Sequence, residues 1–379
     1  MLSLSEEQRM LLDSLERLAE NEFADDAFDW QGETPWENIE LLADKGYLGI
    51  NIDVDYGGGG MSELEAIMTI ETVGSVCPDT AQFLYEQQMV APRAIEMFGS
   101  EAVKEEYLPP VTAGEDMIAV GISEPEAGSD VGAMNTTCED VDGEFRLNGE
   151  KVWVSSVEEA SAAVIWTKFP GEGLGSVLID LDDPGVEMGT HNRNMAGHTQ
   201  SQFYMKDVHV PKTHVLTRGK DAFKEQLKAL NWERLGSATL GNAIAHAALE
   251  RALDYAEDRS QFGQPVADFQ GIEWMIADAT KKLQASRALT YQAAIAAEER
   301  GRIPDRLQTS IAKLYSAEIA EEVVSDSLQL FGANGYQQGH PLEYLYRMVR
   351  GRRIAAGTDE MQKNSIADVV RDDGLPSLT

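Results

Sequence analysis

Apolar residues recur at helical spacing over the first third of the chain. In residues 3–23, leucines at positions 4, 11, 12, 15 and 18 fall on one helical face. Ser5, which is followed by two acidic residues, is the expected N-cap of this helix. Further helical patterns cover residues 36–46, 62–75, 79–98 and 101–113. These patterns predict an N-terminal helical domain over residues 1–115.

The spacing changes to a period of two in residues 116–222. Residues 145–155 alternate around Asn148-Gly149, which we interpret as a hairpin turn, and Asp142-Gly143 is a second turn signal. Apolar runs at 162–169, 176–181 and 203–211 predict additional strands. We therefore expect a central, mostly antiparallel β domain with a barrel-like sheet.

Helical spacing returns in residues 223–379. Residues 233–259 are rich in Gly and Ala, so we expect neighbouring helices to approach closely there. Two amphipathic stretches follow at 271–299 and 309–332, and the second stops at Gly332. Long amphipathic helices with short connections predict a C-terminal four-helix bundle. The predicted fold class is α+β, with the helical, β and bundle domains in that order.

The charge balance limits the possible partners. The 379 residues carry 65 acids and 31 bases, a net charge of −34 that is spread along the whole chain. Such a surface repels nucleic acid and anionic membranes, so we expect neither as a partner. High salt would screen the self-repulsion, which favours a halophilic source over an ordinary acidic cytosolic protein.

Composition also bears on compartment and metals. No apolar run approaches about 18 residues, which predicts that no helix spans a membrane. The N-terminus lacks the basic and apolar regions of a signal peptide, so we expect a cytoplasmic protein. Cys77 and Cys138 have no ligand spacing, and the six histidines form no metal motif, so no metal site is expected.

Several short motifs admit two interpretations each. "ISEPEAGSD" (122–130) could present backbone N–H groups to a polar ring edge, or be a surface loop. In "KVWVSS" (151–156), Trp153 could cover a flat ring while Ser155 bonds its edge, or Trp153 could be a core residue. In "RSQFGQP" (259–265), Arg259 and Gln261 could hold a pyrophosphate, or form a helix end and a turn.

Together with "QLFGANGY" (329–336) and "GTDEMQ" (357–362), these motifs occur in an order that resembles the acyl-CoA dehydrogenase family over nearly the whole chain. The resemblance implies a homotetramer that binds FAD between the β domain and the bundle. It also implies an acyl-CoA substrate and an electron-transfer flavoprotein as acceptor. The expected pathway is fatty acid or branched-chain catabolism.

The resemblance assigns a role to each matching position. Ile122 and Ser123 would follow the flavin edge, Trp153 would shield the ring, and Ser155 would donate to flavin N5. Ser129, Arg234 and Gly357 would contact the substrate, Arg234 at the pantetheine. Thr358 and Glu360 would meet the FAD of their own subunit. The FAD of a neighbouring subunit would be held by Arg259, Gln261, Phe262, Gln329, Gly332 and Ala333.

Three positions depart from the family pattern. Glu126 and Ala333 replace glycines, and Ala356 stands where most members carry the catalytic glutamate. In the isovaleryl-CoA and long-chain branches the glutamate lies on the first bundle helix, immediately before an arginine. Glu233-Arg234 matches that placement, so the resemblance implies Glu233 as the base. The alternative is a surface acid stabilised by the helix dipole.

The implied reaction removes an α proton and a β hydride from the acyl group. Glu233 would take the proton, and the backbone N–H of Ala356 would stabilise charge on the thioester oxygen. The alternatives are a flavoprotein of the same fold with another substrate or with oxygen as acceptor, and a non-catalytic binding homologue. The sequence leaves open the acyl chain length and branching, the physiological acceptor and the pathway. It also leaves open whether Glu86, Gln87 and Gln88 line the pocket or face solvent.

Overall fold

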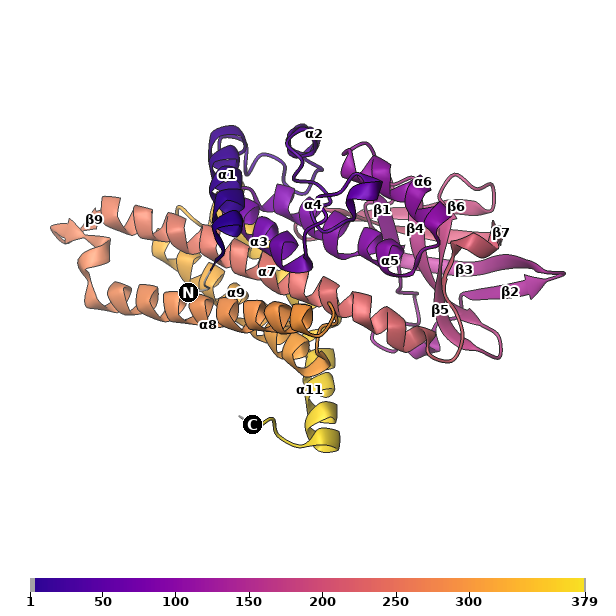
Figure 1. Cartoon of the computed structure of the whole chain (residues 1–379). Coiled ribbons are helices and arrows are strands. Elements are labelled where there is room, and N and C mark those ends of the chain that lie inside the picture. The colour runs from indigo at the N-terminus through magenta and orange to yellow at the C-terminus, as the bar shows by residue number, and fades with distance from the viewer. Residues whose placement is uncertain (1–3, 378–379) are drawn as a thin grey trace. The chain divides into compact units, whose positions relative to one another are not determined.

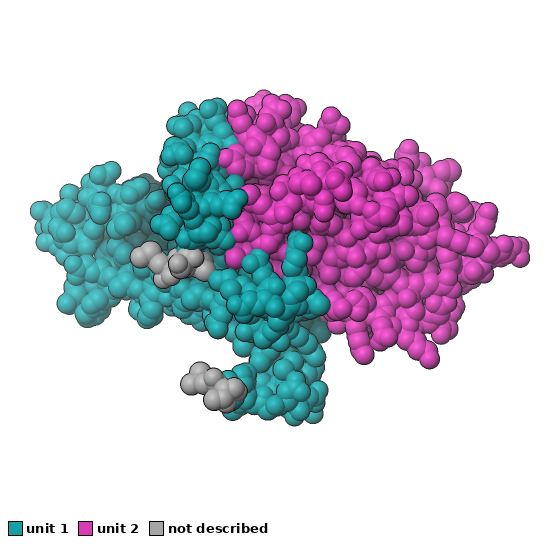
Figure 2. All heavy atoms as spheres, viewed as in Figure 1, with its two compact units in different colours: residues 1–34, 67–82, 233–379 teal, residues 35–66, 83–232 magenta. Residues whose placement is uncertain are grey.

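A computed structural model describes residues 4–377 of the chain. By internal contacts the chain divides into two compact units, which Figure 2 distinguishes by colour. Unit 1 comprises residues 1–34, 67–82 and 233–379, and unit 2 comprises residues 35–66 and 83–232. Three of the four divisions fall inside the helices α3 (Glu63–Gly74), α4 (Pro78–Met89) and α7 (Ala222–Asp258), and the fourth precedes the helix that begins at Trp36. These units are not the three domains expected from the sequence, whose limits remain a prediction.

Unit 1 is built mainly from helices, and the longest of them are labelled in Figure 1. Besides its parts of α3, α4 and α7, it contains α1 (Glu6–Glu22), α8 (Gln270–Glu299), α9 (Arg306–Phe331), α10 (Pro341–Arg350), α11 (Asp359–Asp373), the short helices η4 (Val266–Asp268) and η5 (Gly351–Arg353), and a hairpin of β9 (Ser260–Gln261) and β10 (Gln264–Pro265).

The predicted start of the first helix is confirmed. Ser5 is the N-cap of α1: its Oγ accepts from the Gln8 N–H at 3.1 Å, and its own N–H donates to Gln8 Oε1 at 3.0 Å. This reciprocal capping box satisfies two donors that would otherwise lack helical partners. The helix α9 likewise stops at Gly332, which follows its last residue with φ 57°.

Close packing in the Gly- and Ala-rich part of α7 also matches the prediction. Ser316 Oγ on α9 donates to the Ala238 carbonyl oxygen on α7 at 2.6 Å. Ser286 Oγ on α8 donates to Asn242 Oδ1 at 2.6 Å, and all four residues are fully or almost fully buried. A side-chain hydroxyl reaches a helix backbone only when small residues let the two helices come near each other. The three helices therefore share a buried polar centre with satisfied hydrogen bonds.

Unit 2 combines a sheet with short helices (Figure 1). Its helices, besides parts of those named above, are α2 (Trp36–Asp44), η1 (Val54–Tyr56), α5 (Ala91–Phe98), α6 (Glu101–Thr112), η2 (Val131–Ala133) and η3 (Lys212–His214). Its strands are β1 (Ile118–Gly121), β2 (Thr137–Val141), β3 (Glu144–Ser155), β4 (Ala162–Phe169), β5 (Gly173–Asp180), β6 (Val186–Arg193), β7 (Thr199–Val210) and β8 (Val215–Thr217).

The sheet is mostly, but not wholly, antiparallel. The strand order is β6-β7-β3-β2-β4-β5-β8, and β1 pairs with β4 outside this path. The β1–β4 pair and the single β2–β4 contact are parallel, whereas the other pairs are antiparallel. Because the order has two ends, the barrel-like description is a loose one.

The predicted hairpin at Asn148-Gly149 is wrong. Both residues lie inside β3, which continues to Ser155, and the pairing with β7 shifts register between Leu147 and Gly149. A Cβ added to Gly149 would lie 2.3 Å from Thr136 Oγ1, so the glycine permits close backbone packing at a bulge instead of a turn. The turn at Asp142-Gly143 is confirmed: it joins β2 to β3 with φ of 56° and 88°.

Apolar side chains of β3, β4, β5 and β7 form the main core of unit 2. Leu147, Ile165, Val177 and Phe203 are completely buried there. Each fully buried side chain of this kind contributes about 1.5–3 kcal/mol relative to an exposed one, so this face fixes the strand register. Over residues 4–377, no helix has the length and apolar character needed to cross a membrane.

Candidate functional site

Two of the predicted motifs lie side by side in unit 2. The segment after β1 carries Ile122 and Ser123, and the end of β3 carries residues 151–155. The Val152 N–H donates to the Ser123 carbonyl oxygen at 3.0 Å, and Lys151 Nζ donates to the Ile122 carbonyl oxygen at 3.1 Å. The fold therefore brings together two segments, about thirty positions apart, that were predicted to contact the same flavin ring.

A buried ion pair holds these two segments together. Lys151 Nζ lies 2.9 Å from Glu124 Oε1, and the two side chains are 0% and 3% exposed. Burial alone would raise the pKa of Glu124, but the Asn135 and Thr136 N–H groups and the Lys151 ammonium donate to its carboxylate and lower the pKa overall. Sequence reasoning missed this pair. Lys151 stands among other polar residues of β3, such as Arg146 and Glu150, so it carried no local signal.

Trp153 points away from the sheet. Its φ is +60°, the pairing with β7 is irregular between Lys151 and Val154, and 62% of its side chain is exposed. A bulge turns an exposed side chain outward at the cost of local strain, a feature that is frequent beside functional sites. Ser155 lies two residues on, at the end of β3, and is half-buried. The structure thus excludes the core interpretation of Trp153.

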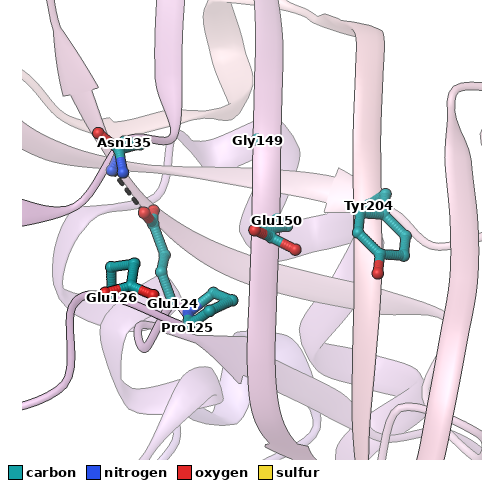
Figure 3. A pocket seen from close by; sticks show the side chains of 7 residues that line it. All are labelled: Glu124, Pro125, Glu126, Asn135, Gly149, Glu150 and Tyr204. Atoms are coloured by element: carbon teal, nitrogen blue, oxygen red, sulfur yellow. Dashed lines mark hydrogen bonds between the residues drawn. The ribbon is translucent and has the colours of Figure 1, made fainter.

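A cavity of about 320 Å³ opens beside this segment (Figure 3). Its lining residues are Glu124, Pro125, Glu126, Asn135, Gly149, Glu150 and Tyr204. Figure 3 shows Glu124 reaching toward Asn135, with Glu150 and Tyr204 on neighbouring strands. Three carboxylates make this cavity unfavourable for phosphate groups. Ser129, the predicted CoA contact, is exposed and is not among the lining residues.

The second group of predicted residues lies in unit 1, at the turn before α11. Ala356 has φ 56° and Gly357 has φ 88°, so two successive residues adopt the left-handed conformation. For a non-glycine residue this conformation costs on the order of 1 kcal/mol, and it persists only where the surroundings enforce it. A Cβ on Gly357 would lie 2.9 Å from Gln362 Nε2, so a side chain there would displace its neighbours.

Three side chains hold this turn by its carbonyl groups. Arg234 Nε donates to the Ala356 oxygen at 3.1 Å, while Lys313 Nζ and Gln362 Nε2 donate to the Gly357 oxygen at 2.8 and 3.0 Å. Because Arg234 follows Glu233 directly on α7, the predicted base and the turn with Ala356 belong to one neighbourhood within unit 1. Two of the three predicted substrate contacts, Arg234 and Gly357, lie in this cluster.

Positive charge is concentrated under the turn. Lys313 is 1% exposed and lies 3.7 Å from the buried carboxylate of Asp359, which also accepts from Arg353 Nε at 2.6 Å. Burial lowers the pKa of Lys313 to about 8; Asp359 opposes this shift, and the nearby Arg352 and Arg234 add to it. Burial also lowers the pKa of Arg234. Sequence reasoning missed Lys313, which reads as one polar position on an amphipathic helix.

The remaining motifs lie at the exposed ends of the bundle helices. Arg259 and Gln261 are exposed on or beside the β9–β10 hairpin, and Phe262 at its tip is 96% exposed with φ 53°. The Tyr255 ring, one turn earlier on α7, stacks on Phe331 with centroids 4.2 Å apart.

Asn334 Nδ2 also donates to the Tyr255 hydroxyl oxygen at 3.0 Å. The structure therefore brings the hairpin near the end of α9, where the remaining predicted cofactor contacts Gln329, Gly332 and Ala333 are found. Thr358 caps α11, with its Oγ1 accepting from the Met361 N–H at 3.3 Å, and Glu360 is exposed in the first turn.

Three comparisons with known proteins relate the chain to a known family. Sequence models of the acyl-CoA dehydrogenase N-terminal, middle and C-terminal domains match residues 5–115, 119–208 and 222–370. The chain is 32% identical to the caffeyl-CoA reductase–Etf complex subunit of Acetobacterium woodii, covering 97% of this chain and 98% of that protein. It is 32% identical to a 3-sulfinopropanoyl-CoA desulfinase of Advenella mimigardefordensis, covering 99% and 96%.

The fold agrees with these sequence matches. The butyryl-CoA dehydrogenase of Megasphaera elsdenii superposes with a TM-score of 0.91 at 27% identity, covering 98% of this chain and 100% of that one. The order of helical, β and helical parts, the clustered motifs and the three matched domain models all lead to the same conclusion. The chain belongs to the acyl-CoA dehydrogenase family.

Proposed function

We propose that this protein catalyses FAD-dependent α,β-dehydrogenation of an acyl-CoA thioester to a trans-2-enoyl-CoA, with Glu233 as the base. The observation that supports it best is the hydrogen bond from Arg234 Nε to the Ala356 oxygen. It puts the residue next to Glu233 against the turn that lacks a carboxylate at position 356. A glutamate on α7 can then supply the charge that the turn does not carry.

The chain's residues fit the cofactor. Trp153 is an exposed indole at a bulge, and Ser155, Ile122 and Ser123 lie beside it, which suits the face and edge of a flat ring. The exposed hairpin with Arg259, Gln261 and Phe262 suits the other half of a dinucleotide in a neighbouring subunit, as do Gln329, Gly332 and Ala333. Thr358 and Glu360 at the α11 N-terminus would face their own subunit's cofactor. FAD, when bound, accepts the hydride from the β carbon.

The turn and its cations would stabilise the negative charge that develops on the thioester oxygen. Arg234 and Lys313 bind the carbonyl oxygens of Ala356 and Gly357, so these carbonyls are held on the side of the cations. The backbone N–H groups of the turn can then donate to the substrate. Fixed donors in a buried, positive environment stabilise an oxyanion strongly because they need no reorganisation. Glu233 would meanwhile take the α proton.

The same residues would catalyse the reverse reaction, in which Glu233 returns a proton to the α carbon. A relative that matches nearly the full length is named as a caffeyl-CoA reductase–Etf complex subunit, which favours reduction of an enoyl-CoA as the second candidate. That name also supports an electron-transfer flavoprotein as redox partner. We further propose a homotetramer, because a hairpin as exposed as residues 259–265 suits a contact with a second subunit.

The experiment is the Glu233→Gln variant. It keeps the size and polarity of the side chain but removes the carboxylate. FAD content and acyl-CoA binding should match the parent, while the stopped-flow rate of flavin bleaching by substrate should fall by about 10²- to 10⁴-fold. Glu225→Gln, which removes a carboxylate that pairs with Lys228 on the same helix, is the matched control and should bleach at the parent rate. A Glu233→Gln protein that bleaches as fast as the parent would exclude Glu233 as the base.

A further inference from the structure

The last turn of α4 carries three consecutive polar residues that face inward. Glu86 Oε2 accepts from Ser156 Oγ at 2.9 Å, and Gln87 Oε1 accepts from the Ile118 N–H at 3.1 Å. Gln88 is 1% exposed, and within the described residues neither its amide nitrogen nor its amide oxygen has a hydrogen-bond partner. Solvent exposure therefore does not explain Gln87 or Gln88, and only Gln88 lacks a side-chain partner within the described residues.

Asn51 adds a third unpaired atom at the same end of α4. Its Nδ2 donates to the Gln88 carbonyl oxygen at 3.0 Å, while its Oδ1 has no partner among residues 4–377 and the residue is 0% exposed. Buried polar atoms are nearly always hydrogen-bonded because an unpaired one destabilises the fold. A native protein keeps such a group where a ligand or an ordered water completes it.

The position of this group relates it to the proposed reaction. Ser156, which binds Glu86, directly follows Ser155, the proposed neighbour of the hydride-accepting atom. Gln88 lies two residues beyond Glu86 on α4, which places it about 3 Å further along the helix axis, since each residue advances an α-helix by about 1.5 Å. It shares a helical face with the fully buried Leu84, one turn earlier. An apolar face that ends in an unpaired amide suits an acyl chain that is apolar first and polar beyond the β carbon.

We propose that Gln88, assisted by Asn51, binds a neutral hydrogen-bonding group on the acyl chain beyond the β carbon, such as a hydroxyl. This inference rests on the proposed function and narrows its substrate class to acyl-CoAs with a polar substituent. An amide offers one donor group and one acceptor without charge, which matches a hydroxyl. A carboxylate on the substrate is disfavoured because Glu86 lies in the same helical turn.

The test compares substrates of equal size in the FAD-loaded protein. The pairs are pentanoyl-CoA with 4-hydroxybutyryl-CoA, and hexanoyl-CoA with 5-hydroxypentanoyl-CoA, read by flavin bleaching. In at least one pair the hydroxylated member should have a kcat/KM about 10-fold higher or more, the value of one buried hydrogen bond. Gln88→Met, which keeps the length but not the amide, should bring that ratio to about one. Gln226→Met removes another buried amide that lacks a partner among the described residues, and should leave the ratio unchanged.

A second measurement does not depend on turnover. In ligand-free protein, Gln88→Met should raise the thermal unfolding midpoint, because it removes an unpaired buried amide. Alkyl preference in both pairs, or a preference that survives Gln88→Met, would overturn the inference and leave the dehydrogenase assignment intact. A lowered midpoint would also overturn it, because it would mean that water already satisfies the amide. Failure of every acyl-CoA to bleach the flavin would instead overturn the proposed function, and this inference with it.

Discussion

Asp359→Asn isolates the electrostatics of the turn before α11. Asp359 is 2% exposed, with Oδ1 3.7 Å from Lys313 Nζ and Oδ2 2.6 Å from Arg353 Nε. Asparagine keeps the shape and the acceptor for Arg353 but removes the charge. The substitution therefore leaves the buried ammonium of Lys313 without its counter-charge.

The size of the effect depends on the protonation of Lys313. Two charges 3.7 Å apart attract by about 4 kcal/mol at an effective dielectric constant of about 20. Arg353 is 35% exposed, so solvent screens its share. Lys313 can escape the penalty by releasing its proton, which costs about 1.4 kcal/mol for each pH unit below its folded pKa of about 8. The stability that Asp359→Asn loses is therefore limited to about 1.4 kcal/mol at pH 7 and to about 3 kcal/mol at pH 5.5.

The sign of the pH dependence follows from linkage. The folded pKa of Lys313, about 8, lies below its ordinary value of 10.5, so between these values the unfolded chain binds more protons and this group's contribution to stability rises with pH. In Asp359→Asn the folded pKa falls further, so the rise begins at lower pH. Above about pH 8 Lys313 is neutral in both proteins, and the difference between them should vanish.

The assay is denaturant unfolding of both proteins at about pH 5.5, 7 and 9.5, with unfolding midpoints converted to free energies. We expect the difference to shrink from about 3 kcal/mol to near zero across this range. Asp368→Asn is the matched control, because it breaks the half-exposed pair with Arg306 and should change stability by less than about 0.5 kcal/mol at each pH. A penalty that is constant or that grows with pH would refute the reasoning.

Three further outcomes are expected. Burial raises the pKa of Asp79 to about 7, so this group destabilises the fold progressively as pH rises from about 4 to 7. Asp79→Asn should therefore raise the thermal unfolding midpoint above pH 7 but not near pH 4. A difference between variant and parent midpoints that is the same at both pH values would contradict this. Trp153→Ala should weaken FAD binding about 10-fold in equilibrium titration, whereas Trp274→Ala, equally exposed on α8, should not. FAD content and tetramer fraction should both fall as salt is removed. The chain has 65 acids against 31 bases, and the excess negative charges of neighbouring subunits repel one another once the Debye length exceeds about 10 Å. A flavin-loaded monomer, or a tetramer that is stable without salt, would count against this prediction.

Local signals in the sequence predicted local structure well. The capping box at Ser5, the turn at Asp142-Gly143 and the stop at Gly332 all depend on residues within a few positions of one another. Asn148-Gly149 has the same turn composition but lies inside β3, because its glycine packs closely against Thr136, which directly precedes β2. A dipeptide shows only that a backbone conformation is accessible. Whether that conformation becomes a turn or a bulge depends on contacts with residues distant in sequence.

The same distinction separates the predicted from the missed parts of the site. The family motifs marked Trp153 and the turn at Ala356 as candidates, but not the groups that hold them in place. Lys151 acts through Glu124, 27 positions away, and Lys313 acts through the Gly357 carbonyl, 44 positions away. Neither lysine carries a local signal, since a single basic residue in a strand or a helix ordinarily faces solvent.

The arrangement at α7 explains how a member of this family can lack a carboxylate at position 356. The turn is fixed through its carbonyl oxygens, which Arg234, Lys313 and Gln362 bind, and not through the side chain at 356. Its backbone N–H groups are therefore available whatever residue stands there, and alanine suffices. In the proposed reaction the base then comes from elsewhere, and Glu233 directly precedes Arg234, which is tied to the turn by its hydrogen bond to Ala356. On the proposed function, one turn of α7 would supply both the proton acceptor and the arginine that fixes the turn, so moving the base would not require rebuilding the turn.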